Sequence, residues 1–278
     1  MTTVKFWGTR GSVPTPGAAT VRYGGNTSCV EVRADGQIIV LDAGTGIRPL
    51  GLELAREFNG APINITLLIT HTHWDHIQGF PFFLPAYESK NTIRVLGFEG
   101  ARQGLGSTLA GQMESPYFPI ALQQMPGNVV IEELSDFNFH IGDVKASAAM
   151  VNHPGIAVGY RLSTSAGDIA YLPDNELSND HLQNRKLVDF IAGADVLIID
   201  SQYDCDEYEA HIGWGHGCVD DVVRIAEDGH AKRLYLFHHD PGHDDARVDA
   251  MLAHARNLAK GTPLQVFAAT EGETITLP

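Results

Sequence analysis

The sequence predicts an α/β fold in which two mixed β-sheets are covered by helices. Short runs of β-branched and other apolar residues, bounded by Gly, Asp and Pro, recur along the chain and are typical of strands. Segments with apolar residues at helical spacing are fewer and lie between these runs. Since several consecutive strands are followed by helices, and this happens twice, two sheets with helices on their faces account best for the pattern.

The expected elements follow one another in a regular order. Strands are expected at Val4–Trp7, Ser28–Val32, Gln37–Leu41, Ile63–Thr70, Ile93–Leu96, Val129–Glu132, Val144–Val151, Ala157–Leu162, Ile169–Leu172, Val196–Ile199, Arg233–Phe237, Leu264–Phe267 and Thr274–Leu277. Helices are expected at Thr45–Phe58, Asp180–Ile191, Cys218–Glu227 and Asp244–Leu258. Asp180 and Asp244 suit the N-caps of two of them, because an Asp side chain accepts hydrogen bonds from the free N–H groups of a first turn.

The composition favours one folded domain. The chain has 278 residues, of which 44% are hydrophobic, and this is enough for a sizeable core. There is no internal repeat and no linker rich in Pro, Gly and Ser, so residues 1–278 are expected to form a single domain. No signal peptide and no apolar stretch of about 18 residues is recognisable, so a cytoplasmic protein without a membrane segment is expected.

The charge argues against a protein that coats nucleic acid. The 19 Lys and Arg residues against 34 Asp and Glu residues give a net charge of −15, whereas proteins that neutralise phosphates carry clustered Lys and Arg. A small anionic substrate held by a metal remains compatible, since a metal charge dominates its surroundings. Cys29, Cys205 and Cys218 are too few and too scattered for a disulfide framework and are interpreted as separate free thiols.

The segment Thr70–His76, with the sequence T-H-T-H-W-D-H, is the clearest functional signal, and it directly follows an expected strand. In an extended segment, residues two apart point the same way, so His71 and His73 can reach one ion. Asp75 and His76, where the chain turns toward a helix, can point at a second ion. Imidazole and carboxylate groups at this density suit Zn²⁺, Mn²⁺ or Fe.

This H-x-H-x-D-H pattern resembles that of the metallo-β-lactamase superfamily, whose other motifs also occur here in the family's order. They are Leu41-Asp42-Ala43-Gly44, Asn152-His153-Pro154, Asp174 and His238, each at the end of an expected strand. The resemblance implies the family's αββα sandwich of two mixed sheets flanked by helices. It also implies that Asp42 orients metal ligands, although Asp42 equally suits an N-cap of the helix expected from Thr45.

The resemblance implies two divalent metal ions, most simply Zn²⁺, with Mn²⁺ or Fe as alternatives. The implied ligands are His71, His73 and His153 for the first ion, Asp75, His76 and His238 for the second, and Asp174 as a bridge. His239 is the alternative to His238 as the last ligand. These ligands leave room for a bridging water or hydroxide, which two ions about 3.5–4 Å apart would activate as a nucleophile.

Two further motifs narrow the branch of the superfamily. Phe6–Pro14, with the sequence F-W-G-T-R-G-S-V-P, resembles the opening motif of the ribonuclease Z and phosphodiesterase branch; read alone, it is a Gly/Pro loop after the first strand. His216-Gly217-Cys218 resembles the His-x-Ser/Thr motif of ribonuclease Z, with Cys in place of Ser or Thr. The resemblance implies that His216 is catalytic beside Asp75 and either donates a proton to the leaving group or stabilises phosphoryl charge. The alternative is a surface histidine at a helix N-terminus.

The implied function is a dinuclear metal-dependent hydrolase, most simply a phosphodiesterase for a small or cyclic phosphodiester. A tRNA substrate is not expected, because the chain is acidic and no long basic arm of the ribonuclease Z kind lies between His153 and Asp174. The alternatives are a lactonase or another ester or amide hydrolase with the same ligands, and a non-catalytic metal-binding module. The resemblance also allows a homodimer.

Several aromatic residues follow the metal motif and have two interpretations. Phe80, Phe82, Phe83 and Tyr87, together with a second group around Tyr117, either line a pocket that stacks on a substrate ring or pack in the core. His243 similarly either lines the substrate cleft or lies among the solvated residues at a helix cap.

Overall fold

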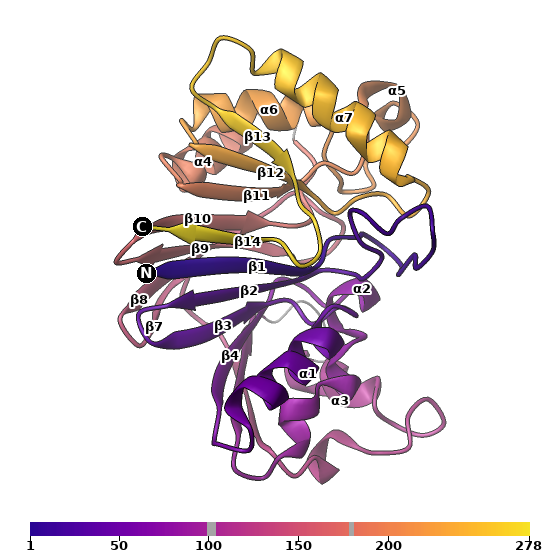
Figure 1. The fold of residues 1–278 in the computed structure, drawn as a ribbon, viewed down its shortest axis with the longest axis vertical. Coiled ribbons are helices and arrows are strands. Elements are labelled where there is room, and N and C mark those ends of the chain that lie inside the picture. The colour runs from indigo at the N-terminus through magenta and orange to yellow at the C-terminus, as the bar shows by residue number, and fades with distance from the viewer. Residues whose placement is uncertain (99–103, 178–180) are drawn as a thin grey trace.

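The computed structural model describes residues 1–98, 104–177 and 181–278. Two seven-stranded sheets pack against each other, and helices cover the outer face of each sheet (Figure 1). The predicted arrangement of two mixed sheets flanked by helices is therefore confirmed.

The bounds of the elements are close to those predicted. The first sheet contains β1 (Thr2–Gly8), β2 (Cys29–Ala34), β3 (Gln37–Leu41), β4 (Asn64–Ile69), β5 (Thr92–Gly97), β6 (Asn128–Glu133) and β14 (Thr274–Leu277). The second contains β7 (Asn138–Ile141), β8 (Val144–Met150), β9 (Val158–Thr164), β10 (Gly167–Leu172), β11 (Val196–Asp200), β12 (Arg233–Phe237) and β13 (Gln265–Ala268). The helices are α1 (Ile47–Phe58), α2 (Trp74–Ile77), α3 (Gly104–Gly111), α4 (His181–Ile191), α5 (Cys205–Tyr208), α6 (Val219–Asp228) and α7 (Asp245–Leu258), with 3₁₀ turns η1 (Phe80–Phe82), η2 (Leu84–Tyr87) and η3 (Leu122–Gln124).

Each sheet combines parallel and antiparallel neighbours. The strand order is β14-β1-β2-β3-β4-β5-β6 in the first sheet and β13-β12-β11-β10-β9-β8-β7 in the second. Strands β3 to β6 run parallel, as do β10 to β13, while the remaining pairs are antiparallel. Parallel strands bring their carboxyl ends to one edge of a sheet, where loops can combine side chains from several strands.

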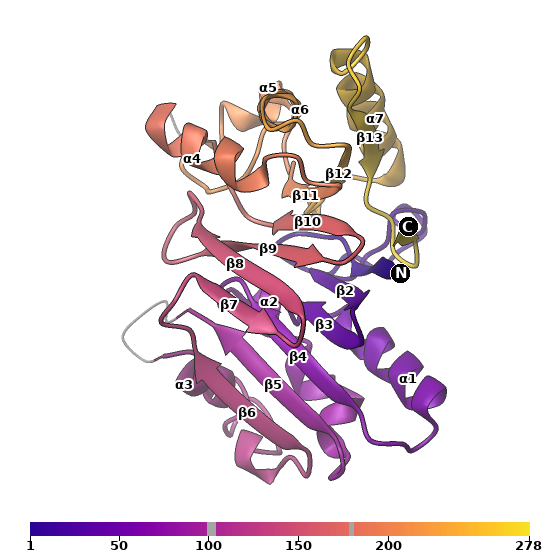
Figure 2. The same cartoon turned by 90° about the vertical axis from the view of Figure 1, so that its left-hand side faces the viewer.

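Apolar side chains fill three layers, one between the sheets and one under each set of helices. Figure 2 shows the sheets and helices from a second side. Strand β12 shows how one sequence serves two layers. Leu234 and Leu236 pack toward the helices that cover the second sheet, whereas Tyr235 and Phe237 face the first sheet. This alternation follows from the two-residue period of a strand, and it explains why strands buried on both faces are apolar throughout.

Among the elements that the sequence did not predict are the helix α3 and the strand β7. The sequence of α3, G-L-G-S-T-L-A-G, is rich in Gly and therefore poor in intrinsic helix propensity. Leu105 and Leu109, one turn apart, are both buried, so tertiary packing stabilises this helix. Strand β7 has only four residues, too few for a clear alternation, and it is ordered by pairing with β8.

The predicted cap of the last helix is confirmed, because the side chain of Asp244 accepts a 2.8 Å hydrogen bond from the backbone N–H of Arg247. Asp180 lies outside the described residues. Helix α1 begins at Ile47 after an N-cap at Gly46 that makes no side-chain bond. In the described part of the chain, no helix has both the length and the apolar character needed to cross a membrane.

Replacing Asp244 by Ala should lower the free energy of unfolding by about 1 kcal/mol, because the first turn of α7 loses its cap. Asp244→Ser keeps a capping oxygen and should cost under about 0.5 kcal/mol. Urea unfolding followed by circular dichroism and by fluorescence measures both. Coincident transitions would also agree with the prediction that residues 1–278 form one domain. Equal destabilisation by Ala and Ser would contradict the capping role.

Candidate metal centre and active site

Three histidines meet at the carboxyl end of β4. His71 and His73 follow the strand and precede α2, and His153 lies in the loop after β8. One ring nitrogen of each lies within 4.8 Å of the others, and Nε2 of His153 is 3.1 Å from Nδ1 of His73. Burial lowers the pKa of His71 well below its usual range and also lowers the pKa of His73. Both rings are therefore neutral and keep a lone pair for a cation.

Four buried side chains form a second cluster beside the first. Nε2 of His238 lies 3.1 Å from Oδ2 of Asp75, and Nε2 of His76 lies 2.9 Å from Oδ2 of Asp174. The other carboxylate oxygen of Asp174 is 3.9 Å from Nε2 of His71. Asp174 thus lies between the two clusters and faces both, so the structure brings together all seven residues that the sequence suggested as ligands.

The donor atoms of these clusters fit two divalent cations. Nε2 of His71, Nε2 of His76 and Oδ2 of Asp174 are buried and make no hydrogen bond of suitable geometry, although the last two atoms are only 2.9 Å apart. Such unsatisfied atoms cost free energy in a protein interior. A cation in each cluster would satisfy them with imidazole and carboxylate donors. Burial raises the pKa of Asp75 and Asp174, but the charges of neighbouring imidazoles outweigh it and lower both below the usual range. Both carboxylates are therefore ionised.

Asp42 holds the second cluster in place from behind. Its carboxylate accepts hydrogen bonds from the backbone N–H and the hydroxyl of Thr70, at 2.8 and 2.9 Å, and from the Tyr171 hydroxyl at 2.9 Å. Nδ1 of His76 donates to the same carboxylate at 2.8 Å. Asp42 adopts a φ of 61°, which turns its side chain inward. The predicted orienting contact is present, and the alternative reading as a helix N-cap is wrong.

The N-terminal F-W-G-T-R-G-S-V-P motif forms a wall of the same cluster. The backbone N–H of Ser12, which has a φ of 60°, donates to Oδ2 of Asp75 at 2.8 Å. A side chain at Gly11 would place its Cβ 2.3 Å from Nδ1 of His238, so only glycine fits there. The fully buried guanidinium of Arg10 donates to the backbone carbonyls of Gly24, Asp240 and His243. The motif is therefore more than a loop after the first strand.

His216 stands beside both clusters, on the loop between α5 and α6. Its Nδ1 is 2.8 Å from Oδ2 of Asp200, and its ring stacks on that of His238 with centroids 5.0 Å apart. Burial by itself lowers the pKa of His216, but the charge and hydrogen bond of Asp200 outweigh it and raise the pKa to about 9. The residue is buried, so the alternative of a surface histidine is wrong.

Glu176 fixes the loop that carries His216. Its buried carboxylate accepts hydrogen bonds from the backbone N–H groups of Gly213 and Gly215, both at 2.9 Å, and from the Tyr208 hydroxyl at 2.8 Å. The carbonyl of Gly215 in turn accepts a 3.0 Å bond from Nδ1 of His153. One carboxylate therefore couples the position of the loop to the first cluster.

Sequence reasoning missed three of these supporting residues, Glu176, Asp200 and Gln202. Gln202 accepts a 2.9 Å bond from Nδ1 of His238 through its amide oxygen. A signal for Asp200 was present, because it ends a buried strand in the same way as the polar residues that were recognised. Glu176 and Gln202 lie in irregular loops, and only the folded chain shows what they contact.

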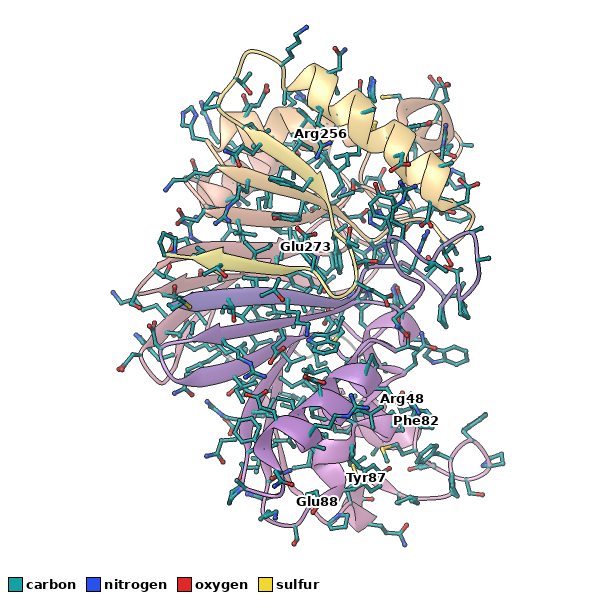
Figure 3. All side chains as sticks on the ribbon, in the orientation of Figure 1. Arg48, Phe82, Tyr87, Glu88, Arg256 and Glu273 are labelled. Atoms are coloured by element: carbon teal, nitrogen blue, oxygen red, sulfur yellow. The ribbon has the colours of Figure 1, made fainter. Side chains whose placement is uncertain are left out.

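Other candidates have structural roles. Nε2 of His239 donates to the carbonyl of Ala269 at 2.9 Å, so the structure favours His238 over His239 as the ligand. His243 is buried, and its Nε2 is bonded to Oε1 of Glu207 at 2.9 Å, so it does not lie among solvated residues. Phe80 and Phe83 are fully buried in the layer under α1, which supports the core interpretation for these two. Phe82 and Tyr87 lie near α1 (Figure 3), and Phe82 packs edge-on against Phe118 with centroids 5.4 Å apart.

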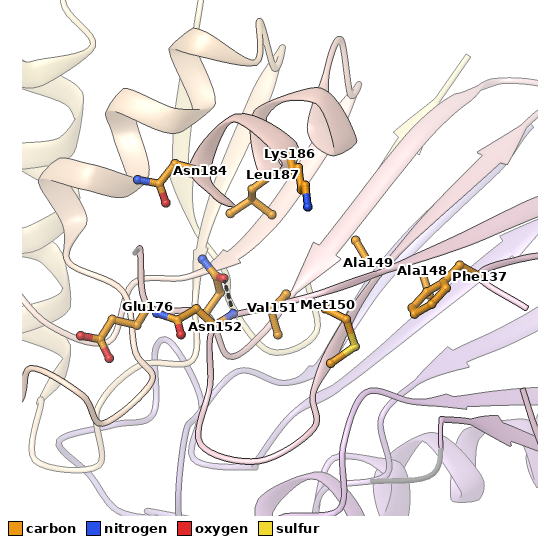
Figure 4. Close-up of a pocket in the computed structure, with 11 residues that line it drawn as sticks. Phe137, Ala148, Ala149, Met150, Val151, Asn152, Glu176, Asn184, Lys186 and Leu187 are labelled. Atoms are coloured by element: carbon orange, nitrogen blue, oxygen red, sulfur yellow. Dashed lines mark hydrogen bonds between the residues drawn. The ribbon is translucent and has the colours of Figure 1, made fainter. Parts of the chain in front are cut away.

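Two cavities adjoin the clusters. One of about 520 Å³ is lined by His153, Glu176 and Ile212, among others. Another, of about 450 Å³, lies between β8 and α4 and includes Asn152 and Glu176 in its wall (Figure 4). Both include Asn152, next to His153, and the cavity of about 520 Å³ also includes Ile212, Gly213 and Gly215 of the loop that holds His216. A substrate group larger than a phosphate therefore has space beside the candidate centre.

Comparison with known proteins agrees with this geometry. Residues 37–239 match the family model described as the beta-lactamase superfamily domain. The ribonuclease Z of Haloarcula marismortui is 22% identical over 97% of this chain and 94% of its own length. The structure of human tRNase Z, short form, aligns with a TM-score of 0.70 at 21% identity over 99% of both chains. The metallo-β-lactamase fold protein YhfI of Bacillus subtilis aligns with a TM-score of 0.69 at 17% identity, over 99% of this chain and 98% of that one. The resemblance and the fold predicted from the sequence are confirmed, and the chain belongs to the metallo-β-lactamase superfamily.

Proposed function

We propose that this chain is a dinuclear metal-dependent hydrolase that cleaves a small or cyclic phosphodiester. The observation that carries the proposal is the pairing of His216 with Asp200 beside the two clusters. When a phosphodiester is hydrolysed, the leaving group departs as an alkoxide, which needs a proton, and a positioned histidine can supply it. The relatives named ribonuclease Z support a phosphodiester in preference to a lactone or an amide.

When bound, two divalent cations would polarise the phosphoryl oxygens and lower the pKa of a water held between them. The chain's own residues supply the remaining steps. Asp200 holds the Nδ1–H of His216, which leaves Nε2 as the atom that donates to the leaving oxygen. Because bound cations lower the pKa of a nearby imidazole, the role of Asp200 is to keep the ring protonated. Glu176 keeps the ring in place by fixing its loop.

The loops around the site favour a substrate of low charge. Trp74, Ile212 and Trp214 are 78%, 62% and 59% exposed. These loops contain one cationic residue, Arg10, and its side chain is buried against backbone carbonyls. The loops counted are segments 9–16, 70–79, 151–157, 173–177, 200–218 and 238–244. A polyanion gains its affinity from many cationic contacts, which these loops do not offer. The rim that they form, with Trp74, Ile212 and Trp214 exposed, therefore suits a substrate with one phosphodiester and an apolar or aromatic group beside it.

An RNA substrate is the second candidate, and the names of the relatives favour it. These names run against the expectation that tRNA is not the substrate. The two candidates differ in salt dependence, because RNA binding weakens steeply with salt while a single phosphodiester is affected little. Competition of a pre-tRNA with a small diester at several salt concentrations separates them.

His216→Ala should lower kcat for a diester with an alkoxide leaving group, such as a cyclic nucleotide, about 10²- to 10⁴-fold, the usual contribution of a general acid. It should lower kcat much less for bis(p-nitrophenyl) phosphate, because a p-nitrophenolate leaves without a proton. The assay uses protein reconstituted with Zn²⁺ or Mn²⁺, and a lactone serves as the alternative substrate. His140→Ala, which changes an exposed histidine on β7, is the control and should keep the full rate. A rate on the cyclic nucleotide within a few fold of the parent in His216→Ala would refute the role of His216 as the acid. Lactone opening without diester cleavage would overturn the proposed substrate class.

Asp75→Ala should remove the second cation, because the carboxylate faces both His76 and His238 in that cluster. We expect the metal content, measured by mass spectrometry of the digested protein, to fall by about one equivalent, and diester hydrolysis to fall at least about 10²-fold. Asp143→Ala, in an exposed turn, is the matched control. Full metal content and rate in Asp75→Ala would show that the ligand assignment is wrong.

Trp74→Ala and Trp214→Ala should each raise KM for an aryl diester roughly 2- to 10-fold, which corresponds to the loss of one aromatic contact. The metal content should not change. Val130→Ala, which trims a part-exposed side chain on β6, should leave KM as it is. If both tryptophan variants bind the diester like the parent, the rim does not select an apolar flank.

A further inference from the structure

Two cysteines that the sequence presents as separate thiols lie side by side. Cys205 is the first residue of α5, and Cys218 is the N-cap of α6. Their sulfur atoms are 3.0 Å apart. Asp220, in the first turn of α6, lies beside them. The two sulfur atoms and one carboxylate oxygen of Asp220 are all within 4.8 Å of one another. The two cysteines are free thiols, as interpreted from the sequence, but their proximity in space was not predicted.

An imidazole and further carboxylates surround these three groups. Nε2 of His254, on α7, is 2.7 Å from Oδ1 of Asp220. A cavity of about 330 Å³ opens beside them and is lined by Cys205, Asp206, Asp220 and His254, among others. Arg247 also lines it, but this guanidinium is paired with Asp204 and Glu207. Negative charge thus converges on a small surface cavity with sulfur donors.

These donors are those of a thiophilic divalent cation. Two thiolates, a carboxylate and an imidazole make up a four-coordinate set of the kind that Zn²⁺ takes in structural sites. The surroundings oppose a reactive thiol, because burial, Cys218 and Asp220 all raise the pKa of Cys205. A disulfide forms through a thiolate, and this neighbourhood disfavours a thiolate unless a cation offsets the charge.

We propose that Cys205, Cys218 and Asp220 bind a third divalent cation of the Zn²⁺ type, with His254 as the fourth ligand. The site lies at the neck of the loop that presents His216. At this neck Tyr203 and Cys218 already form a β-bridge, with Tyr203 N–H donating to the Gly217 carbonyl at 3.1 Å and Val219 N–H to the Tyr203 carbonyl at 3.0 Å. The cation would link α5, α6 and α7 and hold together the two ends of the loop that carries His216. On binding, each thiol releases a proton to solvent and forms a sulfur–metal bond.

Cobalt substitution tests this site separately from the proposed active site. The two catalytic clusters contain only His and Asp donors, so a thiolate-to-Co²⁺ charge-transfer absorption reports the cysteine cluster alone. We expect the full chain loaded with Co²⁺ to show this absorption and to hold one equivalent of metal more than Cys205→Ser, in which the absorption is lost. Cys218→Ser keeps a good N-cap, and Asp220→Asn keeps the shape of the carboxylate. Cys218→Ser should remove the absorption, and Asp220→Asn should weaken Co²⁺ binding at least about tenfold.

The controls separate this site from its neighbours. Asp221→Asn, which changes the adjacent carboxylate on α6, should keep the absorption and the extra equivalent. His153→Ala impairs the first catalytic cluster and should keep the absorption, so a failed proposal for the active site leaves this test intact. The absence of any sulfur–cobalt absorption in the reduced chain would overturn the proposal. So would a native mass lower by two hydrogen atoms, which would identify a Cys205–Cys218 disulfide instead.

Discussion

The carboxylate of Asp42 is the interaction on which the centre depends. It is fully buried, and a buried charge is tolerated only when it is paired and hydrogen-bonded. Its partners come from both sheets, because Thr70 and His76 follow β4 of the first sheet and Tyr171 belongs to β10 of the second. The residue that fixes a ligand therefore also fixes how the sheets meet. A shift of one sheet against the other would break the hydrogen bond from the Tyr171 hydroxyl to this carboxylate.

The same constraint explains why the polar residues lie at one edge. A layer of apolar side chains fills the space between the sheets, so ionisable groups can collect only where strands end and loops begin. His71, Asp174 and His238 follow β4, β10 and β12, and Asp200 ends β11. Their mutual contacts leave several buried atoms without partners. Two bound cations would coordinate these atoms and remove the free-energy cost of leaving them unsatisfied. Metal binding would therefore also stabilise this edge of the fold.

The sequence predicted those parts of the molecule that have a local signal. Period-two runs located the strands, and strand-end motifs located His71, His153 and Asp174, because each of these signals lies within a few neighbouring residues. Contacts between residues far apart in the chain have no such signal. The bond from Gln202 to His238 and the approach of Cys205 to Cys218 both depend on loop conformation. Helix α3 escaped prediction for a related reason, since packing and not propensity stabilises its Gly-rich sequence.

The two halves of the chain contribute different parts of the candidate site. The first sheet supplies His71, His73, Asp75 and His76 from a single segment after β4. The second sheet supplies ligands from three separate loops, and it alone supplies the His216 loop with its anchors Asp200 and Glu176. In such a site, one continuous segment after β4 of the first sheet, residues 71–76, would supply four of the cation ligands. The other sheet, with its buried hydrogen bonds, sets the position of His216, the proposed acid. Because Asp174 faces both clusters, the acid and the cations keep a fixed relation only when the two sheets are packed. Catalytic geometry in this fold is therefore a property of the interface between the sheets.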